Sequence, residues 1–133
     1  MKRTKKEEQV LLYRFHDADM LEQFKAVLKT LHIRATVLKD EDSAEKVGFL
    51  LGIKGFQPAK EKGEAFAFPG EVMILHNIQG KRLDEVLRSM KEAGLPRIHY
   101  KAVVTPFNIL WPLRKLCETM QKEHAEITNS KES

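Results

Sequence analysis

Short apolar runs alternate along the first part of the chain with segments in which apolar residues recur every three or four positions. The runs QVLLYRF (9–15) and IRATVL (33–38) predict two strands. Between them, the apolar positions of residues 20–31 form one stripe at helical spacing, with charged residues on the other side. Asp17 precedes this stripe and is expected to cap the helix. The pattern therefore predicts a strand–helix–strand unit.

A second, shorter helix is predicted after the second strand. Asp42 and Glu45 have the spacing of a capping box, in which Asp42 would be the N-cap. Apolar residues follow at helical spacing, and Gly52 would end the helix. The apolar positions of this helix are Val47, Leu50 and Leu51.

The same order of elements begins again at residue 71. EVMILHNI (71–78) and IHYKAVVT (98–105) predict strands, and an apolar stripe over 83–90 predicts the helix between them. Gly94 and Pro96 are expected to stop that helix. A last helix follows, with Leu113, Leu116, Cys117 and Met120 on one stripe.

The start of the last helix is ambiguous, because Thr105 and Asn108 are both suitable N-caps. If Thr105 were the cap, Pro112 would lie inside the helix, at a cost of roughly 3 kcal/mol. We therefore expect Asn108 to cap the last helix and the Trp111 ring to pack over its first turn. Helix capping, rather than ligand binding, is the favoured role of this cluster.

The two halves are similar enough to indicate an internal duplication. Val10 and Leu12 precede Val72 and Ile74 by 62 positions. The later pairs, Val37 with Val103, Val47 with Leu113 and Leu50 with Leu116, are 66 apart. We expect a single domain over 1–133, because its length is that of one ordinary domain. Its parts are a basic tail (1–8), two βαβα halves (9–53 and 71–127), a long loop between them (54–70) and a polar tail (128–133).

The two halves are expected to share one four-stranded α/β sheet. VLLY and VMIL are nearly unbroken apolar runs, as in strands covered on both faces, so the first and third strands should be central. Right-handed crossovers then give a parallel sheet in the order 2-1-3-4 with helices on both sides. A ferredoxin-like order, 4-1-3-2, in which strands 2 and 3 are antiparallel, is the alternative.

The loop 54–70 is polar except for three phenylalanines, Phe56, Phe66 and Phe68. Loops of this length are usually functional or mobile. The phenylalanines either form an exposed patch that binds a partner or fold back over the sheet.

In a parallel sheet, the loops after the strands would bring several polar groups to one edge. A ligand there would meet His16, Asp17, Asn77, Gly80, Thr105 and Asn108. However, Asp17 and Thr105 or Asn108 are also expected helix caps, and capping alone explains these residue types.

Charge and composition exclude several classes of protein. The net charge is +4, but residues 1–6 carry four basic side chains and no acidic one, so the remainder is neutral. Nucleic-acid binding is therefore not expected. No apolar run is long enough for a membrane span, and a single cysteine fits a cytoplasmic location.

The chain lacks a recognisable catalytic constellation. The five histidines show no paired spacing typical of metal sites, and Cys117 lies on an apolar stripe. Asp40, Glu41 and Asp42 could approach Asp17, but strand 1 ends without an adjacent acidic pair. We expect no catalytic residue, no metal and no cofactor.

Residues 71–120 closely resemble a family of small bacterial proteins classified as a domain of unknown function, DUF 3783, and residues 9–53 resemble it loosely. The resemblance is carried by Ala93-Gly94-Leu95-Pro96 and by Ala102, Thr105-Pro106, Asn108 and Trp111. Pro112 departs from the family pattern. The resemblance implies a shared fold and no particular activity.

Two functions remain open. The first is a non-enzymatic interaction or regulatory module that binds a protein partner or a second copy of itself as a homodimer. The second is a small-ligand-binding domain or minor enzyme that uses the strand-end edge. The first is favoured, because no catalytic constellation is present.

Overall fold

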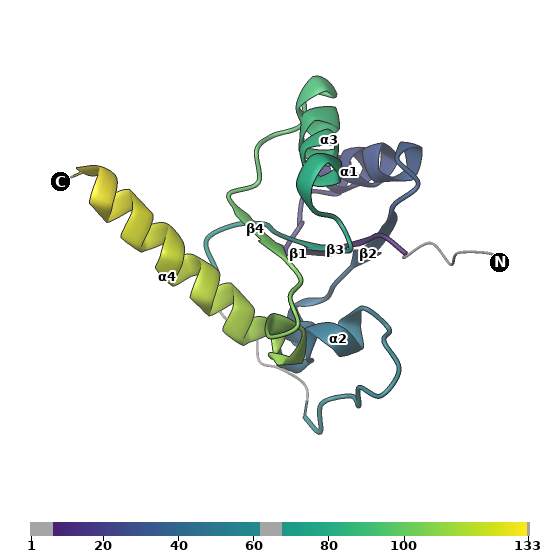
Figure 1. Ribbon diagram of the computed structural model, residues 1–133, viewed down its shortest axis with the longest axis vertical. Coiled ribbons are helices and arrows are strands. Elements are labelled where there is room, and N and C mark those ends of the chain that lie inside the picture. Colours follow the sequence, from purple (N-terminus) through teal and green to yellow (C-terminus); the bar gives the residue numbers. More distant parts are fainter. Residues whose placement is uncertain (1–6, 62–67, 133) are drawn as a thin grey trace.

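In the computed structural model, residues 7–61 and 68–132 are described, with side chains up to residue 124. The predicted strands and helices are all present (Figure 1). The first half contains β1 (Gln9–Tyr13), α1 (Ala18–Thr30), β2 (Arg34–Val37), the short 3₁₀ helix η1 (Asp40–Ala44) and α2 (Val47–Leu50). The second half contains β3 (Val72–His76), α3 (Gly80–Glu92), β4 (Tyr100–Val103), the 3₁₀ helix η2 (Asn108–Leu110) and α4 (Leu113–Glu132).

The described strands form a four-stranded sheet in the order β2-β1-β3-β4, as predicted. The sheet is mixed, however, and the predicted all-parallel arrangement is wrong. β1 is parallel to β2 and β3 is parallel to β4, but β1 and β3 are antiparallel, with Leu11 opposite Ile74. The ferredoxin-like order is also wrong, although β2 and β3 do run in opposite directions. Each half thus forms its own parallel pair, and the two halves meet through their central strands.

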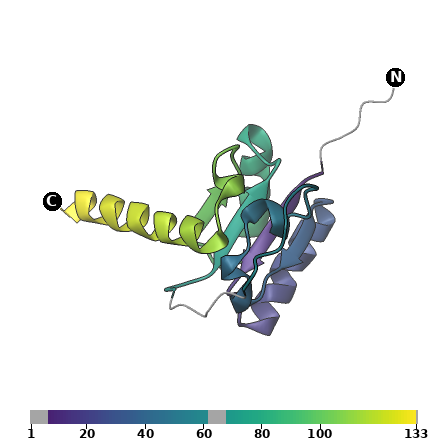
Figure 2. The same cartoon turned by 90° about the horizontal axis from the view of Figure 1, so that it is seen from below.

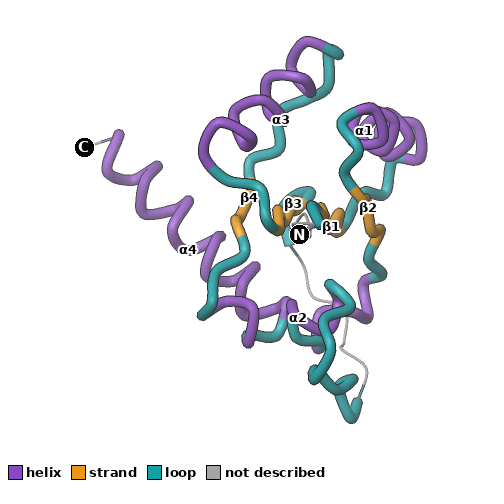
Figure 3. The backbone as a smooth tube through the Cα atoms, turned by 45° about the vertical axis from the view of Figure 1, so that its right-hand side comes forward, coloured by secondary structure: helices purple, strands orange, loops and turns teal. Residues whose placement is uncertain are grey.

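Helices cover both faces of the sheet (Figure 3). α1 and α3 lie on one face, and α2 with the start of α4 lies on the other. Alternate residues of β1 and β3 point to the two cores, since successive side chains of a strand face opposite sides. Val10, Leu12, Met73 and Leu75 belong to the α1/α3 core, and Leu11, Tyr13, Val72 and Ile74 to the α2/α4 core.

The structure confirms the duplication but corrects the alignment of the first strands. Val10 and Val72 face opposite cores, so they are not equivalent. Equivalent residues are 63 apart here: Arg14 and Asn77, which directly follow β1 and β3, both have left-handed backbones, with φ of 66° and 62°. A shift of one residue moves a side chain to the other face, which the apolar run alone does not reveal.

Both long helices of the sheet's first face end in the same way. Gly94 follows α3 with φ 77°, and the amide of Leu95 donates to the carbonyl of Met90, which confirms the predicted helix stop. In the first half His32 takes the left-handed position, with φ 60°, and the amide of Ile33 donates to the carbonyl of Leu28. The sequence therefore indicated the end of α3, where the left-handed residue is a glycine, but not the end of α1, where it is a histidine.

The two halves also join on the second face through a symmetric bridge. Lys46 and Pro112, which are 66 positions apart, pair as an isolated antiparallel bridge. The amide of Val47 donates to the carbonyl of Trp111 (2.9 Å), and the amide of Leu113 donates to the carbonyl of Glu45 (2.8 Å). Each closing helix therefore begins beside the other half, and α4 then extends away from the sheet (Figure 2).

The loop after α2 folds back on that helix. A side chain on Gly48 would place its Cβ 2.3 Å from the ring of Phe56, so glycine is required for this contact. Phe68 is buried in the α2/α4 core and packs edge-on against Tyr100, with ring centroids 4.8 Å apart. Phe68 thus folds back over the sheet, whereas Phe56 packs on α2 and remains partly exposed. Phe66 lies outside the described residues.

Candidate functional site

The polar residues predicted to share one sheet edge are divided between two edges. His16 and Asp17 follow β1, whereas Asn77 and Gly80 follow β3, which runs in the opposite direction. Thr105 and Asn108 follow β4, on the same edge as Asn77. The predicted convergence of all six residues is therefore wrong, because it depended on β1 and β3 being parallel.

At the first edge, Asp40 lies near two basic side chains. Its Oδ1 is 3.7 Å from the Arg14 Nη1 and 3.6 Å from the His16 Nε2. Asp17 accepts a 3.1 Å hydrogen bond from the amide of Met20, so it caps α1 as predicted. Within the described part of the chain, no group of three or more histidine, cysteine or acidic residues has the geometry of a metal site.

At the opposite edge, Arg82 joins three separate segments. It makes two 2.8 Å hydrogen bonds to the Glu8 carboxylate and one of 2.8 Å to Glu85, and it donates to the carbonyl of Leu31 at 2.6 Å. The hydrogen bonds to Glu8 and, second, to Glu85 raise the pKa of Arg82 above its ordinary value. The paired carboxylates leave little charge for a ligand, and the cluster's role is structural. Glu8 and Leu31 are far from Arg82 in sequence, so the sequence did not indicate this cluster.

Thr105 and Asn108 cap the same turn reciprocally. The Asn108 Oδ1 accepts from the amide of Thr105 (2.8 Å), and the Thr105 hydroxyl accepts from the amide of Asn108 (3.0 Å). The Asn108 side chain also donates to the carbonyl of Val103 (3.1 Å). Asn108 is therefore the first residue of η2, and its predicted role as N-cap of α4 is wrong. α4 begins after Pro112, which occupies the capping position and loses no helical hydrogen bond.

The first half contains the equivalent turn, 66 positions earlier. There Asp42 Oδ2 accepts from the amide of Lys39 (2.8 Å), as Asn108 does for Thr105. Asp42 thus lies inside η1 and does not cap α2, contrary to the prediction. The predicted partner Glu45 instead accepts a 2.7 Å hydrogen bond from the amide of Ala59 in the following loop.

Two large apolar side chains of this second turn are exposed. Phe107 is 75% exposed and Leu110 is 58% exposed, whereas Trp111 is partly buried against the α2/α4 core with the Lys115 Nζ 4.5 Å from its ring centroid. Of the described large apolar residues, Val37 on β2 is the only other one with comparable exposure. Single exposed apolar side chains are ordinary, but two large ones within three residues of each other are typical of an interaction surface.

Leu110 borders a groove of about 530 Å³ between η2 and the loop after α2, which we call the η2 groove. Its apolar wall includes Phe56 and Pro58, and two lysines, Lys46 and Lys60, lie at its sides. The residues that line it are Ala44, Lys46, Gly55, Phe56, Gln57, Pro58, Ala59, Lys60, Leu110 and Pro112. Of the predicted partner-binding residues, Phe56 contributes to this site.

Cys117 is part of the core rather than a nucleophile. It is fully buried among Leu113, Leu116 and Met120, as its apolar stripe predicted. Burial raises the pKa of its thiol to about 12. A nucleophilic cysteine needs an accessible thiolate, so neither condition is met.

This burial predicts a loss of stability in alkali. The unfolded chain releases the thiol proton near an ordinary pKa of about 8.5–9, whereas the folded chain keeps it. The stabilisation that the buried thiol gives the folded chain is therefore fully present below that pH. As the pH rises toward 12, this stabilisation should fall by at most about 1.4 kcal/mol per pH unit. We expect the difference in unfolding free energy between the wild type and Cys117→Ala, measured in urea, to shrink by about 1–2 kcal/mol between pH 8 and pH 10. A constant difference would show that the thiol ionises equally in both states.

Comparison with known proteins agrees with the sequence resemblance. Within the described ranges, no helix combines the length and apolar character needed to cross a membrane. No curated protein and no solved structure matches the chain. The matching region covers less than half of the chain and spans β3 to α4, including Phe107 and Leu110. Residues 71–127 match the family model described as Domain of unknown function (DUF3783).

Proposed function

We propose that the protein is a non-enzymatic interaction module that binds an acidic, partly apolar segment of another protein in the η2 groove. The observation that carries this proposal is the exposure of Leu110, which lines the groove, and of Phe107, three residues earlier in the chain. Burial of apolar surface is worth about 25 cal/mol per Å², and large side chains that enter a partner's pocket commonly dominate binding. These two residues are therefore the expected anchors.

The internal duplication supports an extended segment as the ligand. In the first half, the chain turns after α2 and covers that side of the bridge, with Phe56 on Gly48 and Ala59 bonded to Glu45. In the second half, the chain continues into α4, which leads away from η2 (Figure 2). By analogy, we expect an extended segment of a partner to lie beside η2, between it and the loop after α2.

Charge specifies the partner further. Lys46 and Lys60 line the groove, and none of the described lining residues is acidic. The lining residues therefore contribute two positive charges and no negative one, and the Glu45 carboxylate lies beside them on the amide of Ala59. A segment that places an apolar side chain on Leu110 and carboxylates near the lysines would complement both features, and its binding should weaken as salt increases.

Selection from a random peptide library displayed on phage tests this proposal. We expect the wild-type protein to enrich acidic peptides with aromatic or aliphatic residues. The double variant Phe107→Ser/Leu110→Ser should bind those peptides at least roughly tenfold more weakly, because the exposed anchors are lost. Val37→Ser is the matched control, since it removes an exposed apolar side chain on β2 that does not line the groove, and should leave binding unchanged.

Two outcomes would contradict the proposal. The first is equal binding of the enriched peptides to the wild type and the double variant. The second is a concentration-dependent dimer in sedimentation velocity that the double variant abolishes. That result would assign the exposed pair to a second copy of the chain instead of a foreign segment.

A further inference from the structure

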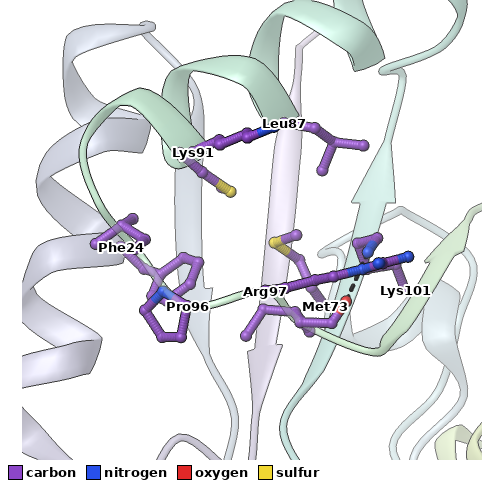
Figure 4. Close-up of a pocket in the computed structure, with 10 residues that line it drawn as sticks. Phe24, Met73, Leu87, Lys91, Pro96, Arg97 and Lys101 are labelled. Carbon is purple, nitrogen blue, oxygen red and sulfur yellow. Dashed lines mark hydrogen bonds between the residues drawn. The ribbon is translucent and has the colours of Figure 1, made fainter.

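A second cavity lies on the other face of the sheet and belongs to a different kind of site. It has a volume of about 410 Å³ and is lined by residues of α1, α3, β3, β4 and the connection between α3 and β4 (Figure 4). We call it the cationic pocket. Its lining consists of Phe24, Met73, Leu87, Met90, Lys91, Leu95, Pro96, Arg97, Ile98 and Lys101.

The pocket combines an apolar interior with positive charge at one side. Phe24 and Met73 are fully or almost fully buried and form part of its floor. Figure 4 shows the Arg97 side chain extending toward Lys101, while Phe24 and Pro96 lie at the opposite end. The two ends therefore differ in chemistry, and a ligand with one charged and one apolar end would fit in a single orientation.

The cations of the pocket lack acidic partners among the described residues. Lys91 and Arg97 form no ion pair there, and none of the described lining residues is acidic. Lys101 is half-buried and donates a 2.6 Å hydrogen bond to the carbonyl of Ile98. Burial and the nearby Arg97 lower the pKa of Lys101, because both disfavour a second positive charge. An anion placed between Arg97 and Lys101 would remove this repulsion.

Comparison of the two halves shows how the pocket arises. Equivalent residues are 62 apart at the helix stops, His32 and Gly94, but 66 apart in the second strands. The second half therefore has four additional residues between α3 and β4. Three of them, Pro96, Arg97 and Ile98, line the pocket. The extra segment thus supplies both a wall and a cation.

The corresponding position in the first half has different chemistry. It is a shallower groove between α1 and β2, in which Lys25 pairs with Glu22 at 3.2 Å. The residue equivalent to Lys101 is Ala35, and Lys25 occupies the position equivalent to Leu87. The apolar interior and the cations Arg97 and Lys101 are therefore confined to the second half, whereas Lys91 has an equivalent in Lys29 of the first-half groove.

We infer that the cationic pocket binds a small organic carboxylate with an apolar tail, such as a medium-chain fatty acid. The carboxylate lies between Arg97 and Lys101, since the guanidinium presents paired donors that match a carboxylate. The tail lies along Phe24 and Met90. The volume is within the range of small-molecule sites, which are typically apolar with a few convergent polar groups.

Titration of the full chain with octanoate tests the site, with octylamine and octanol as probes of the same chain length. Methionine methyl NMR signals report the location, because Met73 and Met90 line the pocket while Met120 lies in the opposite core. We expect octanoate to shift the Met73 and Met90 signals and to leave Met120 in place. Octylamine and octanol should bind at least roughly tenfold more weakly, because neither supplies an anion.

Arg97→Ala should weaken octanoate binding at least roughly tenfold, whereas Arg88→Ala should not. Arg88 is the matched control, because it is an exposed arginine on α3 that pairs with Glu92 and does not line the pocket. Equal shifts with octylamine, an equal effect of the two arginine variants, or no shift at Met73 and Met90 would overturn the inference. None of these results bears on the η2 groove, which lies on the other side of the sheet.

Discussion

Replacement of Leu113 by alanine is expected to lower the free energy of unfolding by about 2–5 kcal/mol. Leu113 is fully buried at the start of α4, and its side chain lies in the α2/α4 core with Val47, its equivalent in the first half. Its amide also donates to the carbonyl of Glu45 in the bridge between the halves. Truncation would leave a cavity where the two halves meet, and neither side can close it without moving the bridge.

Leu110→Ala provides the control for this prediction. It removes the same atoms three residues earlier in the chain, but from a side chain that is 58% exposed. Its cost should stay within about 0.5 kcal/mol, as for most surface substitutions. Urea unfolding of both variants measures the contrast. A comparable loss in the two variants would mean that Leu110 has a structural role, which would also weaken the proposal that it is free to bind a partner.

Replacement of Asn108 by alanine is expected to cost about 2–4 kcal/mol, because it leaves two backbone groups without their hydrogen-bond partner. Asn108 is only 8% exposed, and its amide group both accepts from Thr105 and donates to Val103. The stability cost of an unsatisfied buried group is about 1–3 kcal/mol. Thermal or urea unfolding of the variant, with the wild type measured in parallel, gives the number.

Asp42, the equivalent residue of the first half, separates the contributions of the two Asn108 hydrogen bonds, the one from Thr105 and the one to Val103. Asp42 accepts from Lys39 in the same geometry but is more exposed than Asn108. Asp42→Ala should therefore cost only about 1 kcal/mol, as does the loss of an ordinary cap. If the two alanine variants were equally stable, the bond from Asn108 to Val103 would contribute nothing.

The local elements of this fold follow from short stretches of sequence. The branched, apolar runs gave all four strands, and the apolar stripes gave the helices, because burial on one or two faces imposes a period that is visible in the sequence. Asp17 was identifiable as a cap and Gly94 as a helix stop for a similar reason. Both satisfy backbone groups only a few residues away.

The direction in which the two halves meet could not be predicted from the sequence. The central position of β1 and β3 could be read from their unbroken apolar runs, but such a run is equally apolar in either direction. Their antiparallel direction is visible only in the tertiary structure, in which the two halves also meet at the bridge between Lys46 and Pro112. The same reversal separated His16 from Asn77, so the predicted ligand edge could not have been tested without the tertiary structure.

Some residues of the candidate sites could be predicted from the sequence, and others could not. Sequence alone identified Phe56 as a candidate for partner contact and Cys117 as core, because both follow from local pattern. Only the tertiary structure showed that Phe107 and Leu110 stay exposed, that Arg82 holds Glu8, and that Arg97 faces Lys101 across a pocket. Exposure, ion pairing and cavities depend on which distant segments come together, and the hydrophobic pattern of a segment records its own burial but not the identity of its neighbours.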